Sequence, residues 1–355
     1  MSTAWSIALA ADDRLSILVF GAGAIGGYLG GSLALQGHRV VFLERPHSVP
    51  LLRQHGLQLQ LGERHHHLTN LEVSSSIEDV LKLASFNLAL FALKSYDTAK
   101  ALKALVPVAG SLPPFLCLQN GVENETTLEA FLGAGRVIAG TVTSAVAKDG
   151  PGQIRLERRR GVGLAAGHPL SARLVAAMNA AGLNARLYPD AAAMKWSKLL
   201  TNLLTNATCA ILDLSPAEVM THSGLFALEM RQLREALAVL RALRLPVVDL
   251  PGTPVRALAF GARLPGALAR PLMARAVGRG RGAKLPSLHI DLHSGKGRSE
   301  VDWLNGAVVR AGHRVGVATP VNKILNETLL GMLAGDQPVS AFRRNPAKLL
   351  AALER

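Results

Sequence analysis

The stretch LSILVFGAGAIGGYLGGSLALQGHRVVFL, residues 15–43, decides the fold class of this chain. It begins with an apolar run of strand length and passes through Gly21, Gly23 and Gly26 in a G-x-G-x-x-G pattern. Small and apolar residues typical of a buried helix follow, then a glycine–histidine pair and a second apolar run. Because strand, glycine-rich turn, helix and strand occur in this order, the stretch predicts the first half of a dinucleotide-binding β-α-β unit.

Each residue of the turn has a place in binding a pyrophosphate. Gly21 permits the tight turn, Gly23 lets the backbone approach the phosphates, and Gly26 allows close packing of helix on strand. The first residues of the helix, Ala24 and Ile25, present their N–H groups to the anion. We therefore expect Gly21, Gly23, Ala24, Ile25 and Gly26 to contact the cofactor.

Composition narrows the class of protein. At 355 residues the chain is long enough for two domains, and 49% apolar residues supply a large core. No apolar stretch reaches the roughly 20 residues that a membrane-spanning helix needs. The N-terminal MSTAWSIALAADDR carries no basic residue before its apolar patch, so it is a poor signal peptide. Cys117 and Cys209 lie in apolar segments, which favours buried thiols of a cytoplasmic protein over a disulfide framework.

The net charge of +14 needs its own explanation. Residues 253–284 contain seven basic residues and no acidic one, and a second basic cluster occupies residues 155–160. The seven are Arg256, Arg263, Arg270, Arg275, Arg279, Arg281 and Lys284. A nucleic acid or an anionic surface is one partner for such residues. Because no aromatic residue follows Phe260 in this stretch, base stacking has no platform, and a solvated arginine-rich face that attracts an anionic cofactor and substrate is favoured.

Strand-like and helix-like segments alternate in the first half of the chain, which is typical of a parallel sheet. The expected strands are Ser16–Phe20, Arg39–Leu43, Leu57–Leu61, Asn87–Leu93, Pro114–Leu118 and Val137–Val142, with shorter pieces at Gln153–Leu156 and Val162–Ala165. The expected long helices are Ala191–Leu212, Gly224–Leu243 and Glu300–Val315. The fold class is therefore α/β plus all-α: a Rossmann-like parallel-sheet domain over residues 1–190, then a helical domain over residues 191–355.

Two further expectations follow from this organisation. Ligands bind beyond the carboxyl ends of parallel strands, so a cleft between the domains would receive the nicotinamide end and the substrate. His65–His67 forms a run of three histidines, which we interpret as a solvated loop, and we expect no metal site.

The segment MKWSKLLTNLLTN, starting at Met194, predicts a helix with chemistry on one face. Lys198, Asn202 and Asn206 are spaced four apart, and four residues turn roughly 400°, so successive members drift only about 40° around the axis. An ammonium beside two amides suits a small oxygen-rich anion, and the lysine could protonate a carbonyl oxygen as hydride reaches the carbon. The alternative is an ordinary helix with polar residues on its solvated side, and spacing alone does not choose between the two.

Seven segments in order give the chain a family resemblance. They are GAGAIGGYLG, LKSYDT, LQNGVENE, GTVTSAVAKDGPG, WSKLLTNLLTN, PSLHIDLHSGKGRSEVDWLNG and GVATPVN. With these motifs the chain resembles the ketopantoate reductase family, which reduces 2-dehydropantoate to pantoate with NADPH in the pantothenate and coenzyme A pathway. The resemblance runs from about residue 15 to about residue 335, and the motifs together are far more specific than any one alone.

The resemblance implies catalytic and substrate-binding roles. Lys198 matches the general-acid lysine of the family, and Glu300 matches a glutamate that sits by this lysine and helps to bind substrate and cofactor. A nearby carboxylate would keep the lysine protonated, as a general acid requires. Asn202, Asn206 and Ser287 match side chains that hold the substrate. Two alternatives stay open: Lys195, one turn earlier, as the acid, and a helix N-terminal charge as the role of Glu300.

The resemblance also implies contacts to the cofactor. Lys94 matches a lysine near it, Asn120 an amide near the nicotinamide ribose, and Ala145 a backbone contact. Arg45 matches the arginine that binds the 2′-phosphate, which favours NADPH. Glu44 precedes it and would suit the ribose hydroxyls of NAD. Strand alternation should put the two side chains on opposite sides, so we expect NADPH with NAD as the less favoured cofactor.

Departures from the family pattern fall on the substrate side. The chain has Asn206–Ala207 where Asn-Pro is common, Ser287–Asp291 differs from the usual segment, and residues 253–284 and the tail after Gly335 are longer. They leave the identity of the 2-oxo acid open. The alternatives are therefore a reductase of a different small 2-oxo acid and a non-catalytic NADP(H)-binding regulator. We expect no membrane partner, disfavour nucleic acid, and leave the oligomeric state open, with a homodimer as one option.

Overall fold

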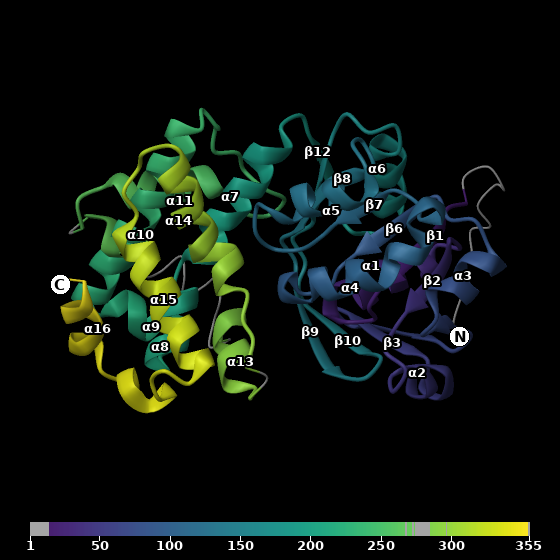
Figure 1. Cartoon of the computed structure of the whole chain (residues 1–355), viewed down its shortest axis with the longest axis horizontal. Helices are drawn as coiled ribbons and strands as arrows, with labels where there is room; N and C mark the ends of the chain where they lie inside the picture. The colour runs from purple at the N-terminus through teal and green to yellow at the C-terminus, as the bar shows by residue number, and fades with distance from the viewer. Residues whose placement is uncertain (1–13, 267, 272, 274–284, 296, 354–355) are drawn as a thin grey trace. The chain divides into compact units, whose positions relative to one another are not determined.

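The computed structural model describes residues 14–353 except 267, 272, 274–284 and 296. The chain divides into two compact units (Figure 1). The sheet unit comprises Met1–Gln119, Asn124–Met194 and Leu250–Thr253, and the helical unit comprises Asn120–Glu123, Lys195–Asp249 and Pro254–Arg355. Residues 1–13 of the N-terminal segment MSTAWSIALAADDR, which we interpret as a poor signal peptide, lie outside the described residues. Four of the basic residues noted above also lie outside them, namely Arg275, Arg279, Arg281 and Lys284.

The main sheet of the sheet unit has eight strands, six of them parallel. Their order is β12 (Ala185–Tyr188), β11 (Val162–Ala165), β8 (Val137–Val142), β7 (Phe115–Cys117), β6 (Leu88–Phe91), β1 (Ser16–Phe20), β2 (Arg39–Leu43) and β5 (Glu72–Ser74). β11 is antiparallel to β8 and carries β12 in parallel beyond it. The chain moves outward from β1 through β2 to β5 and then returns to β6 on the other side of β1. The sheet thus has a topological switch point between β1 and β6, and ligands of such sheets bind there.

β1 shows why several of the predicted strands are continuous apolar runs. Its alternate residues Ile17 and Val19 pack into one apolar cluster, while Leu18 and Phe20 pack into another. A strand buried on both faces has no polar face to show. The helices of this unit are α1 (Ala24–Leu35), α2 (Val49–His55), α3 (Ile77–Leu83), α4 (Thr98–Leu105), α5 (Asn124–Leu132) and α6 (Ser171–Ala180), with 3-10 turns η2 (Ser95–Asp97) and η3 (Val106–Ser111).

A second, four-stranded sheet corrects one interpretation. Its order is β4 (Arg64–Leu68), β3 (Leu57–Leu61), β10 (Gln153–Arg158) and β9 (Ala145–Gly150). His65–His67 lies within β4 and not on a loop, because Gly62, at φ +71°, turns the chain back so that β4 pairs antiparallel with β3. An edge strand with a solvated face accepts histidines. Because β4 consists mostly of polar residues, its sequence lacks the alternation of apolar and polar residues that predicts a strand.

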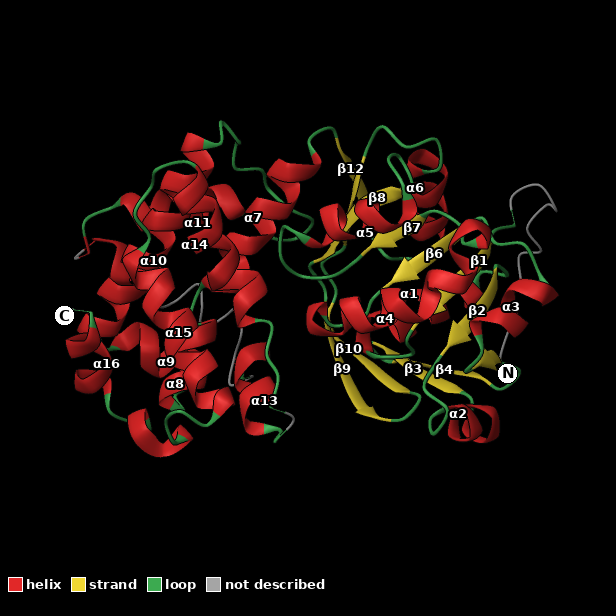
Figure 2. Ribbon diagram, viewed as in Figure 1, coloured by secondary structure: helices red, strands yellow, loops and turns green. Residues whose placement is uncertain are grey.

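The helical unit contains helices and loops, and the described strands belong to the sheet unit (Figure 2). Its helices are α7 (Ala191–Leu203, which starts in the sheet unit), α8 (Asn206–Leu212), α9 (Pro216–Thr221), α10 (Ser223–Ala242), α11 (Val255–Arg263), α13 (Ser287–His293), α14 (Ala307–Arg314), α15 (Pro320–Ala334) and α16 (Pro346–Ala352), with the π turn η4 (Asp302–Gly306) and the 3-10 turn η5 (Val339–Phe342). Among the described helices, none combines the length and apolar character that crossing a membrane requires. Cys117 and Cys209 are buried, as predicted. The α/β-plus-α fold class is confirmed.

Two of the predicted long helices are interrupted. The segment Ala191–Leu212 forms two helices, α7 and α8, with a break at residues 204 and 205. The segment Glu300–Val315 forms the π turn η4 before it continues as α14. π turns inside helices are frequent at functional sites, and both interruptions fall in segments that carry the candidate residues.

Candidate functional site

The glycine-rich turn between β1 and α1 fits a pyrophosphate. Gly21 has φ +90°, a conformation that side chains disfavour. A Cβ at Gly26 would lie 2.0 Å from the Gly21 carbonyl oxygen, whereas a Cβ at Gly23 would meet nothing within 4 Å. Gly23 is the N-cap of α1, without a side-chain capping bond, and the first turn carries no acidic residue. The start of α1 therefore has open space at Gly23, and a dinucleotide phosphate suits the N–H groups of a helix N-terminus.

Glu44 and Arg45 directly follow β2, and both side chains contact other residues of the sheet unit. Glu44 Oε1 accepts the Ala22 N–H at 2.6 Å and Oε2 accepts the Arg45 N–H at 3.0 Å, so this carboxylate lies against the glycine-rich turn. The Arg45 side chain is 69% exposed and reaches Asp97 Oδ2 at 3.3 Å. A carboxylate in this place suits ribose hydroxyls, and an arginine suits a 2′-phosphate. Both residues that we expect to bear on the choice of cofactor thus lie directly after β2.

Lys94 and Ala145 also lie in the sheet unit. Lys94 is half-buried at the N-cap of η2, directly beyond β6 and hence at the switch point of the sheet. Ala145 is the first residue of β9 and pairs with Arg158 of β10. The place of Lys94 is the one at which parallel α/β sheets bind ligands.

The break between α7 and α8 corrects the single-helix prediction. Lys198 and Asn202 lie on α7, but Asn206 begins α8, because Thr205 adopts φ +60°. The buried Glu229 of α10 stabilises this conformation: its carboxylate accepts the Thr205 N–H at 2.7 Å. The same carboxylate accepts the Thr208 hydroxyl at 2.5 Å and the Gln232 amide at 2.9 Å. The three polar residues therefore do not form one continuous helical face.

Asn202 and Asn120 are brought together. The Asn202 amide donates to Asn120 Oδ1 at 3.0 Å, across 82 residues of sequence. Asn120 belongs to the segment Asn120–Glu123, which groups with the helical unit although it follows β7 in the chain. A residue predicted at the nicotinamide ribose and a residue predicted at the substrate are thus direct partners.

Arg310 of α14 anchors the segment that carries Asn120. Its guanidinium donates to Glu123 at 2.7 Å and to Asp302 at 2.9 Å. Burial disfavours the charged form of Arg310, but the two carboxylates outweigh it and raise its pKa. Gly306 leaves room for this network, since a Cβ there would lie 2.2 Å from Asp302 Oδ1 and would force the Asp302 side chain to move.

Asn206 and Ser287 are also brought together. The Asn206 amide donates to Ser287 Oγ at 3.3 Å, and its oxygen accepts the Leu288 N–H at 3.0 Å. Asn206 is buried and satisfies a free N–H in the first turn of α13. Its side chain therefore fixes the position of Ser287.

Lys198, Lys195 and Glu300 differ in burial. Lys198 is half-buried, whereas Lys195 is 4% exposed and Glu300 is 2% exposed. The Glu300 carbonyl accepts the Trp303 and Leu304 N–H groups where the chain enters η4. All three belong to the helical unit, and the pairing of Lys198 with Glu300 stays a prediction.

Sequence reasoning missed the residues that hold the candidates in place. Glu229 and Gln232 lie on the buried face of α10, between Leu228 and Leu233, and a polar residue at such a position is a signal that periodicity could have supplied. Glu123 and Arg310 are separated by 187 residues, and no local pattern links them. Both groups position other side chains.

Several of the described basic residues contact acidic or carbonyl groups. Arg155 pairs with Asp149 at 2.7 Å, Arg256 donates to the Val247 carbonyl at 3.2 Å, and Arg270 donates to the Thr221 carbonyl. These contacts are consistent with a solvated face.

Two family models match the chain in succession. Residues 17–167 match the model described as ketopantoate reductase PanE/ApbA, and residues 190–332 match ketopantoate reductase PanE/ApbA C terminal. The chain is 24% identical over 318 residues to the 2-dehydropantoate 2-reductase of Pyrococcus horikoshii, covering 88% of this chain and 95% of the relative.

Solved structures show the same fold. A PanE/ApbA family ketopantoate reductase from Ralstonia eutropha superposes with a TM-score of 0.76 at 30% identity, covering 91% of this chain and all of that one. A D-mandelate dehydrogenase, solved with NADH and anilino(oxo)acetate, gives a TM-score of 0.75 at 23% identity over 90% of this chain and 99% of that one. The second likeness shows the fold alone.

Proposed function

Since the chain belongs to the ketopantoate reductase family, we propose that it reduces 2-dehydropantoate to pantoate with NADPH. It is an oxidoreductase acting on a CH–OH group, with a nicotinamide cofactor and a small 2-oxo acid as reactants. The observation that carries the finer proposal is the pairing of Asn202 with Asn120 and of Asn206 with Ser287. Four candidate residues from three separate segments meet in these pairs.

Lys198 acts as the general acid in this proposal. The reduced nicotinamide, when bound, supplies a hydride to the carbonyl carbon of the substrate. The Lys198 ammonium gives its proton to the carbonyl oxygen, so that the ketone gains a hydride and a proton and becomes the alcohol. Glu300 favours the protonated lysine.

Ser287 and the two asparagines orient the acid. Ser287 Oγ accepts a hydrogen bond from Asn206, which leaves the hydroxyl proton of Ser287 to donate to the substrate carboxylate. The hydrogen bond to Asn120 holds the Asn202 side chain, and the other hydrogen-bonding groups of the Asn202 amide contact the substrate. Lys94, Ala145 and the turn Gly21–Gly26 bind the cofactor, the turn through its N–H groups.

A panel of 2-oxo acids tests the substrate. We expect kcat/KM with NADPH to be highest for 2-dehydropantoate and to be lower for unbranched and aromatic 2-oxo acids. The nicotinamide absorbance measures each rate. A higher value for another acid would assign the alternative of a different 2-oxo acid reductase, which the departures at Ser287–Asp291 keep open. Salt-dependent DNA binding without turnover of any acid would instead support the regulator hypothesis.

Substitutions after β2 test the cofactor. Arg45→Ala should lower kcat/KM for NADPH about 10-fold, the low end for hydrogen bonds to charged groups because the side chain is exposed, and leave the value for NADH unchanged. Glu44→Gln keeps an acceptor for the Ala22 N–H but removes the charge, so it should raise the value for NADPH and lower that for NADH. Steady-state kinetics with both cofactors check this. An NADPH value that survives in Arg45→Ala means that Arg45 does not bind the 2′-phosphate.

A further inference from the structure

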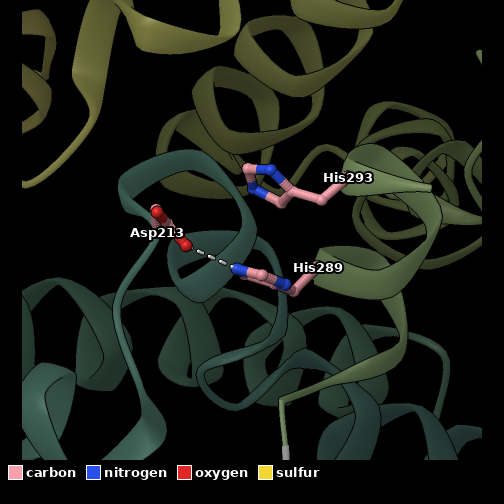
Figure 3. Close-up of side chains that lie close together, drawn as sticks. All are labelled: Asp213, His289 and His293. Carbon is pink, nitrogen blue, oxygen red and sulfur yellow. Dashed lines mark hydrogen bonds and ion pairs between the residues drawn. The ribbon is translucent and has the colours of Figure 1, made fainter. Parts of the chain in front are cut away.

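A histidine–aspartate cluster lies where α8 and α13 end, and the proposed reaction does not use it. Asp213 follows α8, and His289 and His293 lie one turn apart on α13 (Figure 3). His289 Nε2 is 2.8 Å from Asp213 Oδ1, and one donor atom from each of the three side chains lies within 4.8 Å of the others. We propose that Asp213, His289 and His293 form a binding site for a divalent transition-metal ion such as Zn²⁺.

The residue types and their spacing suit such an ion. Two histidines four residues apart lie on one face of a helix and can ligate one metal ion together. Two imidazoles and a carboxylate form a three-ligand set that leaves one tetrahedral position for water. Neutral imidazole and carboxylate favour Zn²⁺ and its late first-row neighbours over Mg²⁺ or Ca²⁺, which prefer oxygen-only sites.

The present separations are close to those of a loaded site. Metal–ligand distances near 2.0–2.1 Å with tetrahedral angles put the donor atoms roughly 3.3 Å apart. The His289–Asp213 pair, at 2.8 Å, must open slightly, and the widest pair, within 4.8 Å, must close. The two imidazole rings stack with centroids 4.2 Å apart, and both extend from α13 towards the turn that carries Asp213 (Figure 3).

The site is anchored on one side and accessible on the other. Asp213 has φ +52° at the end of α8, and its Oδ1 accepts the hydrogen bond from His289 Nε2 at 2.8 Å. His289 is buried, whereas His293 is exposed. An ion can therefore enter from solvent beside His293. In the part of the chain that the structure describes, no other group of three histidine, cysteine or carboxylate side chains gathers its donor atoms this closely.

Arg343 opposes a bound cation. Its Nε lies 3.1 Å from Asp213 Oδ2, which leaves Oδ1 for the ion but puts a like charge beside it. Since the Arg343 side chain is 67% exposed, it can swing away when an ion binds. Because Arg343 competes with a bound cation for Asp213, removing its charge should raise metal affinity, whereas removing a ligand should lower it.

Binding of a metal ion would add a link between α8 and α13. Asn206, at the start of α8, already holds Ser287 and Leu288 at the start of α13. A metal ion on Asp213, His289 and His293 would add a link between the residue that follows α8 and both the first turn and the last residue of α13. The proposal therefore predicts that the ion stabilises the helical unit, and it does not depend on the identity of the substrate.

The test uses the full chain without a histidine tag, stripped with a chelator and titrated with Zn²⁺ or Co²⁺. His65 and His66 are changed to glutamine in every protein, so that the histidine run on β4 does not bind the probe. We expect the protein to bind one equivalent of metal. The visible spectrum of bound Co²⁺ should be that of a low-coordinate ion, and Tm should rise with Zn²⁺ concentration. His293→Ala and Asp213→Asn should each weaken binding on the order of 100-fold or more, beyond the loss that removal of a second-shell partner causes.

Two matched variants complete the design. His313→Ala removes another exposed histidine near a helix end and should leave metal affinity unchanged. Arg343→Gln should raise affinity several-fold because it removes the competing charge. Circular dichroism of each stripped variant establishes that it is folded. The proposal is overturned if the stripped protein binds no Zn²⁺ at micromolar concentrations, or if His293→Ala and Asp213→Asn bind it as tightly as the parent.

Discussion

Replacing Lys198 with alanine should lower kcat for the reduction of 2-dehydropantoate by a factor of about 10²–10⁴, the usual contribution of a positioned general acid. The hydride would still reach the carbonyl carbon, but the developing oxyanion would have only water as its proton source. Because the side chain is half-buried, its removal should leave the fold intact. Steady-state kinetics with nicotinamide absorbance as the readout give kcat and KM separately.

An isotope effect separates a chemical role from a structural one. With NADPH deuterated at the transferred position, the primary isotope effect on kcat should be larger in Lys198→Ala than in wild type, because the chemical step becomes rate-limiting. Lys195→Met is the matched comparison, since Lys195 lies one turn earlier on α7 and is buried. It should change stability more than the isotope effect. If Lys195→Met loses the chemical step and Lys198→Ala keeps a near wild-type rate, the acid is Lys195.

Local patterns predicted the parts of the fold that local physics determines. β1, β2, β8 and β11 have the predicted bounds because apolar runs bounded by glycine or polar residues suit strands, and β3 has them because leucine and glutamine alternate along it. The glycine-rich turn follows from the conformational freedom of Gly21 and the close approach at Gly26. β5, β9 and β12 escaped prediction because they are short or bear polar residues, so their pairing partners define them.

The candidate site shows where sequence reasoning stops. The composition of the segment from Lys198 to Asn206 favours one helix, since neither glycine nor proline marks a break. The break depends on Glu229, which lies 24 residues further along the chain and acts only after α10 has packed. The pairing of Asn120 with Asn202 is likewise a tertiary contact across 82 residues. Residue types were readable from the sequence, but their mutual positions were not.

Glu229→Ala should lower the free energy of unfolding by about 3–5 kcal/mol, because three buried donors lose their acceptor at once and each costs about 1–3 kcal/mol before relaxation. Glu229→Gln keeps the volume but turns an amide N–H₂ towards one of these donors, so about 1–3 kcal/mol is expected. Urea denaturation followed by tryptophan fluorescence measures both, since Trp196 lies on α7. Arg231→Ala, at an exposed position of the same helix, should change stability by less than about 0.5 kcal/mol. A Glu229→Ala midpoint equal to that of wild type would contradict the assigned role.

The same substitution should also change substrate binding, for a geometric reason. A left-handed residue other than glycine costs roughly 1–2 kcal/mol, so Thr205 keeps φ +60° only while Glu229 accepts its N–H. Without that acceptor, α7 and α8 can join into one continuous helix, which would rotate Asn206 towards the face of Asn202 and away from Ser287. Glu229→Gln, measured where it is fully folded, should therefore raise KM for the 2-oxo acid more than KM for the cofactor. Equal changes in both would mean that Glu229 supports the helical unit as a whole, without setting the position of Asn206.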